Sequence, residues 1–163
     1  MRVPDSTPSP CSPWLRFGKY LGFTVLLLCM LILARPASAD PACVAGPHSG
    51  TLGVSQEWCA IHSPHTVSGG VYVPSGVTLT IEANVAVQFN SGAMLIVQSG
   101  GALIVAGTEA QPVTFTSSSG TPAPGAWRGL DLQSGSMAQI EYLDLAYAGQ
   151  TDGRSVRIMN SNA

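Results

Sequence analysis

Charged residues are scarce in this 163-residue chain, since Lys, Arg, Asp and Glu together make up only 10% of it, against roughly 25% in a typical soluble domain. Cysteine is rare, with four residues, and aromatic side chains account for 7%. Gly (18) and Pro (12) are frequent instead, which predicts many turns and argues against a helical bundle. The length allows one domain at most.

One long apolar run is present, over residues 20–34 near the N-terminus. A positively charged segment precedes it, and Ala37-Ser38-Ala39 follows it in the small-residue pattern of a cleavage site. This order predicts a signal peptide over residues 1–39, cleaved after Ala39, and therefore an extracellular, cell-surface or periplasmic protein. A retained membrane anchor is the alternative, but a run of about 15 residues is shorter than the roughly 20 that a spanning helix needs.

Lysine is absent after residue 39, where three arginines stand against eight carboxylates, a net charge of −5. Such a surface does not attract the phosphate backbones of nucleic acids. It is equally unsuited to anionic lipid surfaces. The charge therefore argues against a nucleic-acid partner, and against membrane association once the signal peptide is removed.

Two cysteines remain after the predicted cleavage, Cys43 and Cys59. In an exported protein this pair predicts one disulfide. A zinc site is the alternative, in which His62 and His65 would complete the ligands, with His48 in reserve. Their spacing matches no structural zinc pattern, so the disulfide is favoured and no metal or other cofactor is expected.

An eight-residue pattern repeats four times without a gap from residue 74 to 105, as PSGVTLTI, EANVAVQF, NSGAMLIV and QSGGALIV. The third residue of each octad tolerates left-handed backbone angles and so marks a turn. The sixth and eighth residues are apolar and share one face of an extended strand. These inward positions are Leu79, Ile81, Val87, Phe89, Leu95, Val97, Leu103 and Val105.

Each octad is thus a turn followed by a strand that is too short to bury its own apolar face. Repetition at a fixed period predicts that the octads coil and stack on one another. About three octads would close one coil of a three-sided β-helix, with Leu103 over Leu79. An antiparallel meander of hairpins is the alternative, but the octads lack the Asn-Gly and Asp-Gly turns that tight hairpins favour.

Four outward positions are apolar, namely Met94, Ile96, Ala102 and Ile104. An apolar outer strip on an acidic scaffold indicates that something covers it. The favoured cover is the segment between the two cysteines, folding back as part of an N-terminal cap over residues 40–66, because solenoids need a terminal cap. A partner protein or a second copy of the chain is the alternative.

A second pattern follows the octads: GT at 107–108, PVTFTS at 112–117, a Pro/Gly-rich excursion at 121–125, WRGL at 127–130 and a further strand at 140–149. Together with the octads, over about residues 71–149, this combination resembles bacterial secreted right-handed parallel β-helix repeat proteins. The resemblance implies an all-β fold, a right-handed parallel β-helix of about three coils over residues 67–163. Members of this group include surface and adhesin-like proteins, carbohydrate-active enzymes and many chains of unknown role.

The candidate ligand-binding residues are Trp127, Arg128, Asp131 and Asp144. A single Trp beside a Gly/Pro loop packs more often than it stacks on a sugar. Asp131 and Asp144 both lie between leucines, so both point outward, and their separation of 13 residues places them on different sides of the coil. Solvated outer positions are the favoured explanation for both. No nucleophile–base arrangement is visible, and no catalytic residue is assigned.

Residues 154–159 read as the start of another strand, which turn residues follow up to Ala163. An uncovered rung exposes unpaired edge groups. We therefore expect either that this rung stacks on another chain or that the sequence is the N-terminal piece of a longer protein, and the second is favoured. The sequence therefore predicts a secreted or cell-surface β-helix scaffold or interaction module that is not itself an enzyme. A surface glycan, or another protein chain at the open rung, is the expected partner. The alternative is the N-terminal part of a carbohydrate-active enzyme, of the polysaccharide lyase or hydrolase type.

Overall fold

The computed structural model describes residues 43–159. The predicted signal peptide, residues 1–39 with its cleavage after Ala39, lies outside these residues, as does the predicted turn at 160–163. Within the described range the fold is an all-β parallel β-helix, and each strand pairing is parallel. This part of the chain contains no helix of the length and apolarity that crossing a membrane requires.

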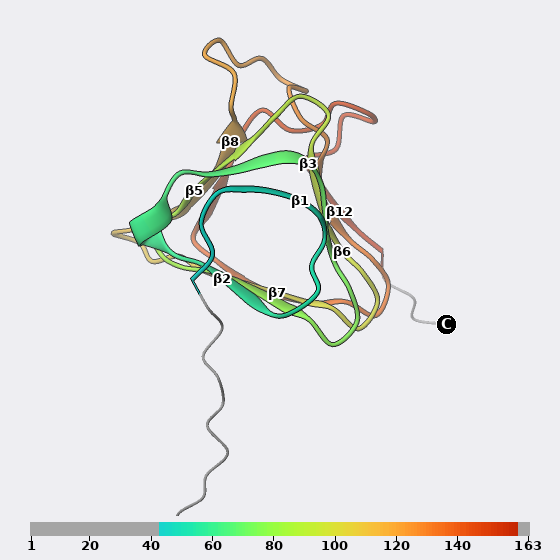
Figure 1. Ribbon diagram of the computed structural model, residues 1–163. Helices are drawn as coiled ribbons and strands as arrows, with labels where there is room; N and C mark the ends of the chain where they lie inside the picture. The colour runs from blue at the N-terminus through green and yellow to red at the C-terminus, as the bar shows by residue number, and fades with distance from the viewer. Residues whose placement is uncertain (1–42, 160–163) are drawn as a thin grey trace, which may run out of the picture. The chain divides into compact units, whose positions relative to one another are not determined.

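Three successive coils of three strands make up the body of the fold (Figure 1). Their strands are β4 (Thr78–Ile81), β5 (Ala86–Phe89) and β6 (Met94–Val97); β7 (Ala102–Ala106), β8 (Val113–Ser117) and β9 (Gly129–Leu132); and β10 (Met137–Glu141), β11 (Leu143–Leu145) and β12 (Val156–Ile158). Each strand pairs with its counterpart one coil away. One face is therefore β4–β7–β10, the second β5–β8–β11 and the third β6–β9–β12.

The N-terminal end adds strands to the same three faces. These elements are β1 (Pro47–Thr51), β2 (Gln56–Trp58), the 3₁₀ helix η1 (Ala60–His62) and β3 (His65–Val73). Strand β2 pairs with β4, and the long strand β3 pairs first with β5 and then with β6, while β1 lies on β3. The cap was predicted over residues 40–66; the described part of it, residues 43–66, supplies strands to the coil. The predicted boundary at residue 67 falls inside β3.

The octads predicted the coil length and the turns correctly. Leu79 pairs with Leu103, and both side chains are fully buried. The third residue of each octad has a left-handed backbone, with φ between 63° and 77°, at Gly76, Asn84, Gly92 and Gly100. The turns stack as well, since the Gly76 N–H donates to the Gly100 carbonyl and the Gly100 N–H to the Gly135 carbonyl, both at 2.9 Å.

The inward side chains of successive coils form one continuous core. Trp127 belongs to it: the indole is fully buried and stacks on Phe89 with ring centroids 3.9 Å apart and planes 6° from parallel. Its Nε1 donates a hydrogen bond to the Ala146 carbonyl at 2.9 Å. Packing is therefore the role of Trp127, and no face of its ring is left to stack on a sugar.

The prediction that the segment between the cysteines covers the apolar outer residues is wrong, because its strands pair with β3 and β4 instead. Met94, Ala102 and Ile104 stay partly exposed on β6 and β7. Ile96 is only 8% exposed and lies in register between Tyr72 and Asp131. Outward side chains stack from coil to coil in the same way as inward ones, because the strands pair in register. The N-terminal segment instead continues the coil through β1 and β2.

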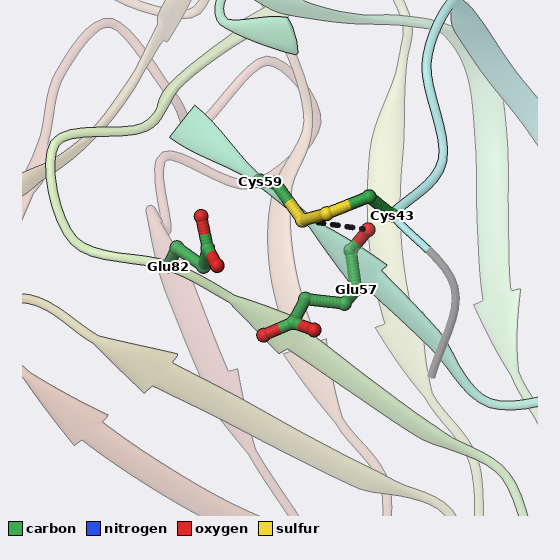
Figure 2. A group of neighbouring side chains, drawn as sticks. All are labelled: Cys43, Glu57, Cys59 and Glu82. Atoms are coloured by element: carbon green, nitrogen blue, oxygen red, sulfur yellow. Dashed lines mark hydrogen bonds between the residues drawn. A yellow bond between two sulfur atoms is a disulfide. The ribbon is translucent and has the colours of Figure 1, made fainter. Parts of the chain in front are cut away.

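Cys43 and Cys59 form the predicted disulfide, with their Cα atoms 5.6 Å apart (Figure 2). Cys43 also makes a parallel bridge with Glu57, so the disulfide joins the strand that enters the coil to the end of β2. The sequence separation is 16 residues. Closing a loop of this length contributes about 3 kcal/mol in the chain-entropy description of disulfide stabilisation.

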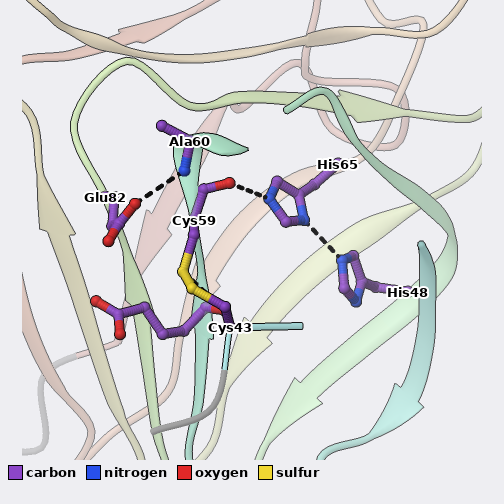
Figure 3. Close-up of a disulfide and its surroundings, with 7 residues drawn as sticks. Cys43, His48, Cys59, Ala60, His65 and Glu82 are labelled. Carbon is purple, nitrogen blue, oxygen red and sulfur yellow. Dashed lines mark hydrogen bonds between the residues drawn. A yellow bond between two sulfur atoms is a disulfide. The ribbon is translucent and has the colours of Figure 1, made fainter. Parts of the chain in front are cut away.

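A buried histidine pair lies beside this disulfide (Figure 3). His48 Nε2 lies 3.0 Å from His65 Nδ1, and His65 Nε2 lies 3.0 Å from the Cys59 carbonyl oxygen. A carbonyl only accepts, so His65 carries its proton on Nε2, and its Nδ1 accepts from His48. Trp58 stacks on the His48 ring at 4.1 Å between centroids. Burial, and then the neighbouring His65, lower the pKa of His48 to about 4, and burial also lowers the pKa of His65.

Replacing Leu103 by Ala tests the stacked core. We expect Leu103→Ala to lower the free energy of unfolding by about 2–5 kcal/mol, because it leaves a cavity opposite the buried Leu79. Thr80→Ala, an outward residue of β4, is the matched control and should cost less than about 1 kcal/mol. Denaturant unfolding followed by circular dichroism measures both, and equal losses would contradict the assigned register.

The histidine pair predicts a stability that falls in acid. The unfolded chain takes up a proton at the ordinary pKa of 6.5, whereas folded His48 does so only near pH 4. Stability is therefore complete above about pH 6.5 and is lost as the pH falls towards 4, by roughly 2–3 kcal/mol. His48→Phe keeps a ring on Trp58 and should flatten this slope, while His62→Gln, at an exposed histidine, should not. If the free energy of unfolding of His48→Phe depends on pH as steeply as that of the unmodified protein, the acid sensitivity does not arise from His48.

Candidate functional site

The third face of the coil carries a hollow of about 200 Å³, formed by β6, β9, β12 and the loop before β12. We call it the arginine hollow. The side chains that matter for its chemistry are Met94, Arg128, Asp131, Asp152, Arg154 and Arg157. Residues 43–159 contain three arginines and no lysine. All three of these arginines line the arginine hollow.

Asp131 is the buried acid of the hollow. Its neighbours Leu130 and Leu132 point into the core, so Asp131 points outward, as predicted. The prediction that it is solvated is wrong, since the residue is only 5% exposed. The reason is register: Asp131 pairs with Arg157 one coil later, and the longer side chain lies across it.

Arg157 holds both oxygens of this carboxylate. Its Nε donates to Asp131 Oδ1 at 3.2 Å, and its Nη2 makes a short contact with Oδ2. Such a two-pronged pair is the strong form of the arginine–carboxylate interaction. The hydrogen bond from Arg157 to Asp131 and the charge of the carboxylate raise the pKa of Arg157. Asp131 is therefore a structural partner of Arg157, which binds each of its two oxygens.

The other two arginines are held more loosely. Arg154 Nη1 lies 3.9 Å from Asp152 Oδ2, and both side chains are exposed, so this pair contributes little to stability. Arg128 is exposed; its Nη1 lies 3.6 Å from the Met94 sulfur. Among the described residues Arg128 makes no ion pair with a carboxylate.

The structure brings together two of the four candidate residues. Arg128 and Asp131 line the same hollow, Trp127 lies in the core behind it, and Asp144 is exposed on β11 on the second face. Asp131 and Asp144 thus lie on different faces, as their spacing predicted. Asp152, Arg154 and Arg157, which also line the hollow, were not among the residues predicted from the sequence. Their signal was present, because Arg157 follows Asp131 by 26 residues, close to one coil.

The three histidines of residues 43–159 lie away from the arginine hollow. His48 and His65 are buried at the N-terminal end and bond to each other, while His62 lies on η1, and none of the three lines the arginine hollow. The carboxylates in the hollow, Asp131 and Asp152, each face an arginine. The hollow is therefore suited to binding an anionic group more than to transferring a proton.

Comparison with known proteins adds a family to this geometry. A family model described as a pectate-lyase-like beta helix domain matches residues 56–156. Neither the curated proteins nor the solved structures gave a match. The family is related to enzymes, although the match itself assigns no catalytic residue. The matched segment runs from β2 into β12 and covers more than half of the chain; this protein belongs to the pectate-lyase-like β-helix domain family.

Proposed function

We propose that this protein is a β-helix interaction module that binds an acidic glycan in the arginine hollow and has no catalytic activity of its own. One observation carries the proposal: the three arginines of residues 43–159 gather in one hollow of about 200 Å³, although this part of the chain has seven carboxylates. Cations gathered on an acidic protein raise the local concentration of an anionic ligand.

The hollow supports a ligand that carries carboxylate groups. Guanidinium groups present paired donors that match the two oxygens of a carboxylate. Arg128 has its donors free of protein carboxylates, and Arg154 is held only by an exposed contact of 3.9 Å, which a ligand can replace at little cost. Arg157 remains bound to Asp131 and forms the rigid wall of the hollow.

The same contacts support binding without turnover. Hydrolysis of a glycosidic bond needs two carboxyl groups on either side of the bond, one to donate a proton and one to attack or to activate water. Asp131 has both oxygens bound by Arg157. Asp152 Oδ1 accepts a hydrogen bond from the Arg154 backbone N–H at 3.1 Å. This bond holds the Asp152 carboxylate against the backbone of the loop before β12.

A carbohydrate-active enzyme is the second candidate, and two observations favour it. The family match is to a pectate-lyase-like domain, and the hollow combines carboxylates with arginines. Polysaccharide lyases of the β-helix class use clustered acids that bind calcium and a basic residue that removes a proton. In that case Asp131 would have to leave Arg157 during the reaction.

We further propose that the protein acts outside the cytoplasm. Support comes from the signal-peptide pattern of residues 1–39 and from the disulfide between Cys43 and Cys59, because structural disulfides persist in oxidising compartments. A glycan at the cell surface, or one in the surrounding medium, would then be within reach of the arginine hollow.

Glycan binding can be tested with two matched oligosaccharides, an oligogalacturonate and the neutral oligogalactose of the same length. We expect calorimetry to detect the acidic oligomer only, with binding weakened by salt. Arg128→Ala should weaken it about tenfold, as expected for a charge-assisted hydrogen bond. Asp144→Asn, on another face, is the control and should bind normally. Equal binding of both oligomers, or normal binding by Arg128→Ala, would contradict the proposal.

Turnover separates the two candidates. We expect no unsaturated product and no new reducing ends from polygalacturonate, with or without added calcium, because the carboxylates of the hollow are bound to arginines. Ultraviolet absorbance and a reducing-sugar assay measure the two outcomes. If product forms and Asp131→Asn abolishes it while the fold persists, the enzyme is the correct assignment and the non-catalytic module is not.

A further inference from the structure

Four potential metal-binding side chains converge where the chain enters the coil (Figure 2). They are Cys43, Glu57, Cys59 and Glu82; one ligand atom from each lies within 4.8 Å of the others. The group is on the face formed by β2 and β4, whereas the arginine hollow is on the face formed by β6, β9 and β12. It therefore needs an explanation of its own.

Strand pairing explains the convergence. Trp58 pairs with Ile81, which places the next residues, Cys59 and Glu82, side by side. Cys43 reaches the group through its bridge to Glu57. One oxygen of Glu82 accepts from the Ala60 backbone N–H at 2.9 Å (Figure 3). This bond fixes the carboxylate and leaves its second oxygen available.

We infer that these four residues form a redox-controlled site for a divalent metal ion of the zinc type, which the disulfide closes and reduction opens. A dithiol reductant supplies two electrons and two protons and becomes a disulfide, while the sulfur–sulfur bond of the protein becomes two thiols. With a phosphine reductant, water supplies the two thiol protons and its oxygen ends in the phosphine oxide. A bound cation then displaces the two thiol protons, which leave to solvent. The product is a metal ion held by two thiolates and two carboxylates.

The chemistry of the ligands selects the metal. Zn²⁺ accepts four ligands in a tetrahedron, from Cys sulfur at about 2.3 Å and from carboxylate oxygen at roughly 2.0–2.2 Å. Ligand atoms in such a tetrahedron are roughly 3.3–3.8 Å apart. The ligand atoms of the four residues lie within 4.8 Å of one another, so the carboxylate oxygens need to move only slightly closer, while the two sulfurs, bonded to each other in the disulfide, move apart once reduction breaks that bond. The thiolates disfavour Mg²⁺ and Ca²⁺, which prefer oxygen ligands alone.

Burial gives the site both a fixed wall and an entrance. Cys59 is 2% exposed, and Glu57 and Glu82 are half-buried, whereas Cys43 is exposed. An ion can therefore approach from the side of Cys43. Without a metal, two thiolates and two carboxylates this close together would repel one another, so the opened site favours a cation.

The histidines of the zinc site weighed from the sequence are not part of this group. His65 uses both ring nitrogens, for His48 and for the Cys59 carbonyl, and His62 lies on η1. The carboxylates of Glu57 and Glu82 take their place. The sequence alone could not show this, because Glu82 reaches Cys59 only through the pairing of β2 with β4.

The site can be tested with Co²⁺, whose thiolate complexes absorb visibly, in the full chain with Cys11→Ser and Cys29→Ser to remove the other thiols. After reduction with a phosphine, we expect one equivalent of Co²⁺ to bind with thiolate-to-metal charge-transfer bands and to be displaced by Zn²⁺. The oxidised chain should show no such bands. Zn²⁺ should also protect Cys43 and Cys59 from alkylation.

Carboxylate variants separate this site from binding by two thiols alone. Glu57→Gln and Glu82→Gln should each weaken Co²⁺ binding about tenfold or more, as loss of a ligand does, while Glu109→Gln should bind normally. Unaltered affinity in both variants overturns the proposed ligand set. Circular dichroism of the reduced chain is measured in parallel: a folded chain without the bands, or a chain that unfolds on reduction, also overturns the inference. None of these outcomes depends on whether the protein binds a glycan.

Discussion

Hydrogen bonding between successive coils sets the position of each side chain in the body of this protein. Each short strand pairs in parallel with the strand one coil away, so inward residues stack on inward residues and outward residues on outward ones. No strand of this length could bury its apolar face alone. The stacked column from Leu79 to Leu103 and the aromatic group around Trp127 are direct results of this constraint.

The same constraint builds the arginine hollow. Asp131 and Arg157 meet because they occupy equivalent outward positions of β9 and β12. The loop before β12 then adds Asp152 and Arg154 beside them. A surface on a β-helix is thus a column of residues separated by one coil, and its charge depends on the length of each coil. A loop that lengthens a coil changes the sequence separation between residues that stack on one another, and it leaves the paired strands undisturbed.

The N-terminal end shows how the coil is closed. Trp58, His48 and His65 stack over the first turn of the core, and the disulfide holds the incoming strand against β2. Two buried imidazoles that share a hydrogen bond replace the apolar packing of the coils below. The buried position favours the neutral form of both histidines, so this end of the coil is expected to respond to acid. It is expected to respond to reduction because it carries the disulfide.

The sequence by itself determined the repeating unit. The octads place turns at residues such as Asn84 and apolar side chains at Leu79 and Leu103 through local rules of backbone angle and alternation, and such rules need no knowledge of distant residues. Only the tertiary structure decided which outward residues meet. Beyond Val105 the coils carry loops of unequal length, so a separation close to one coil pointed to Asp131 and Arg157 but could not establish that they meet. Cys59 lies before the octads, so their pattern could not show that Glu82 lies beside it. Those contacts depend on the register of paired strands, which is a property of the whole coil.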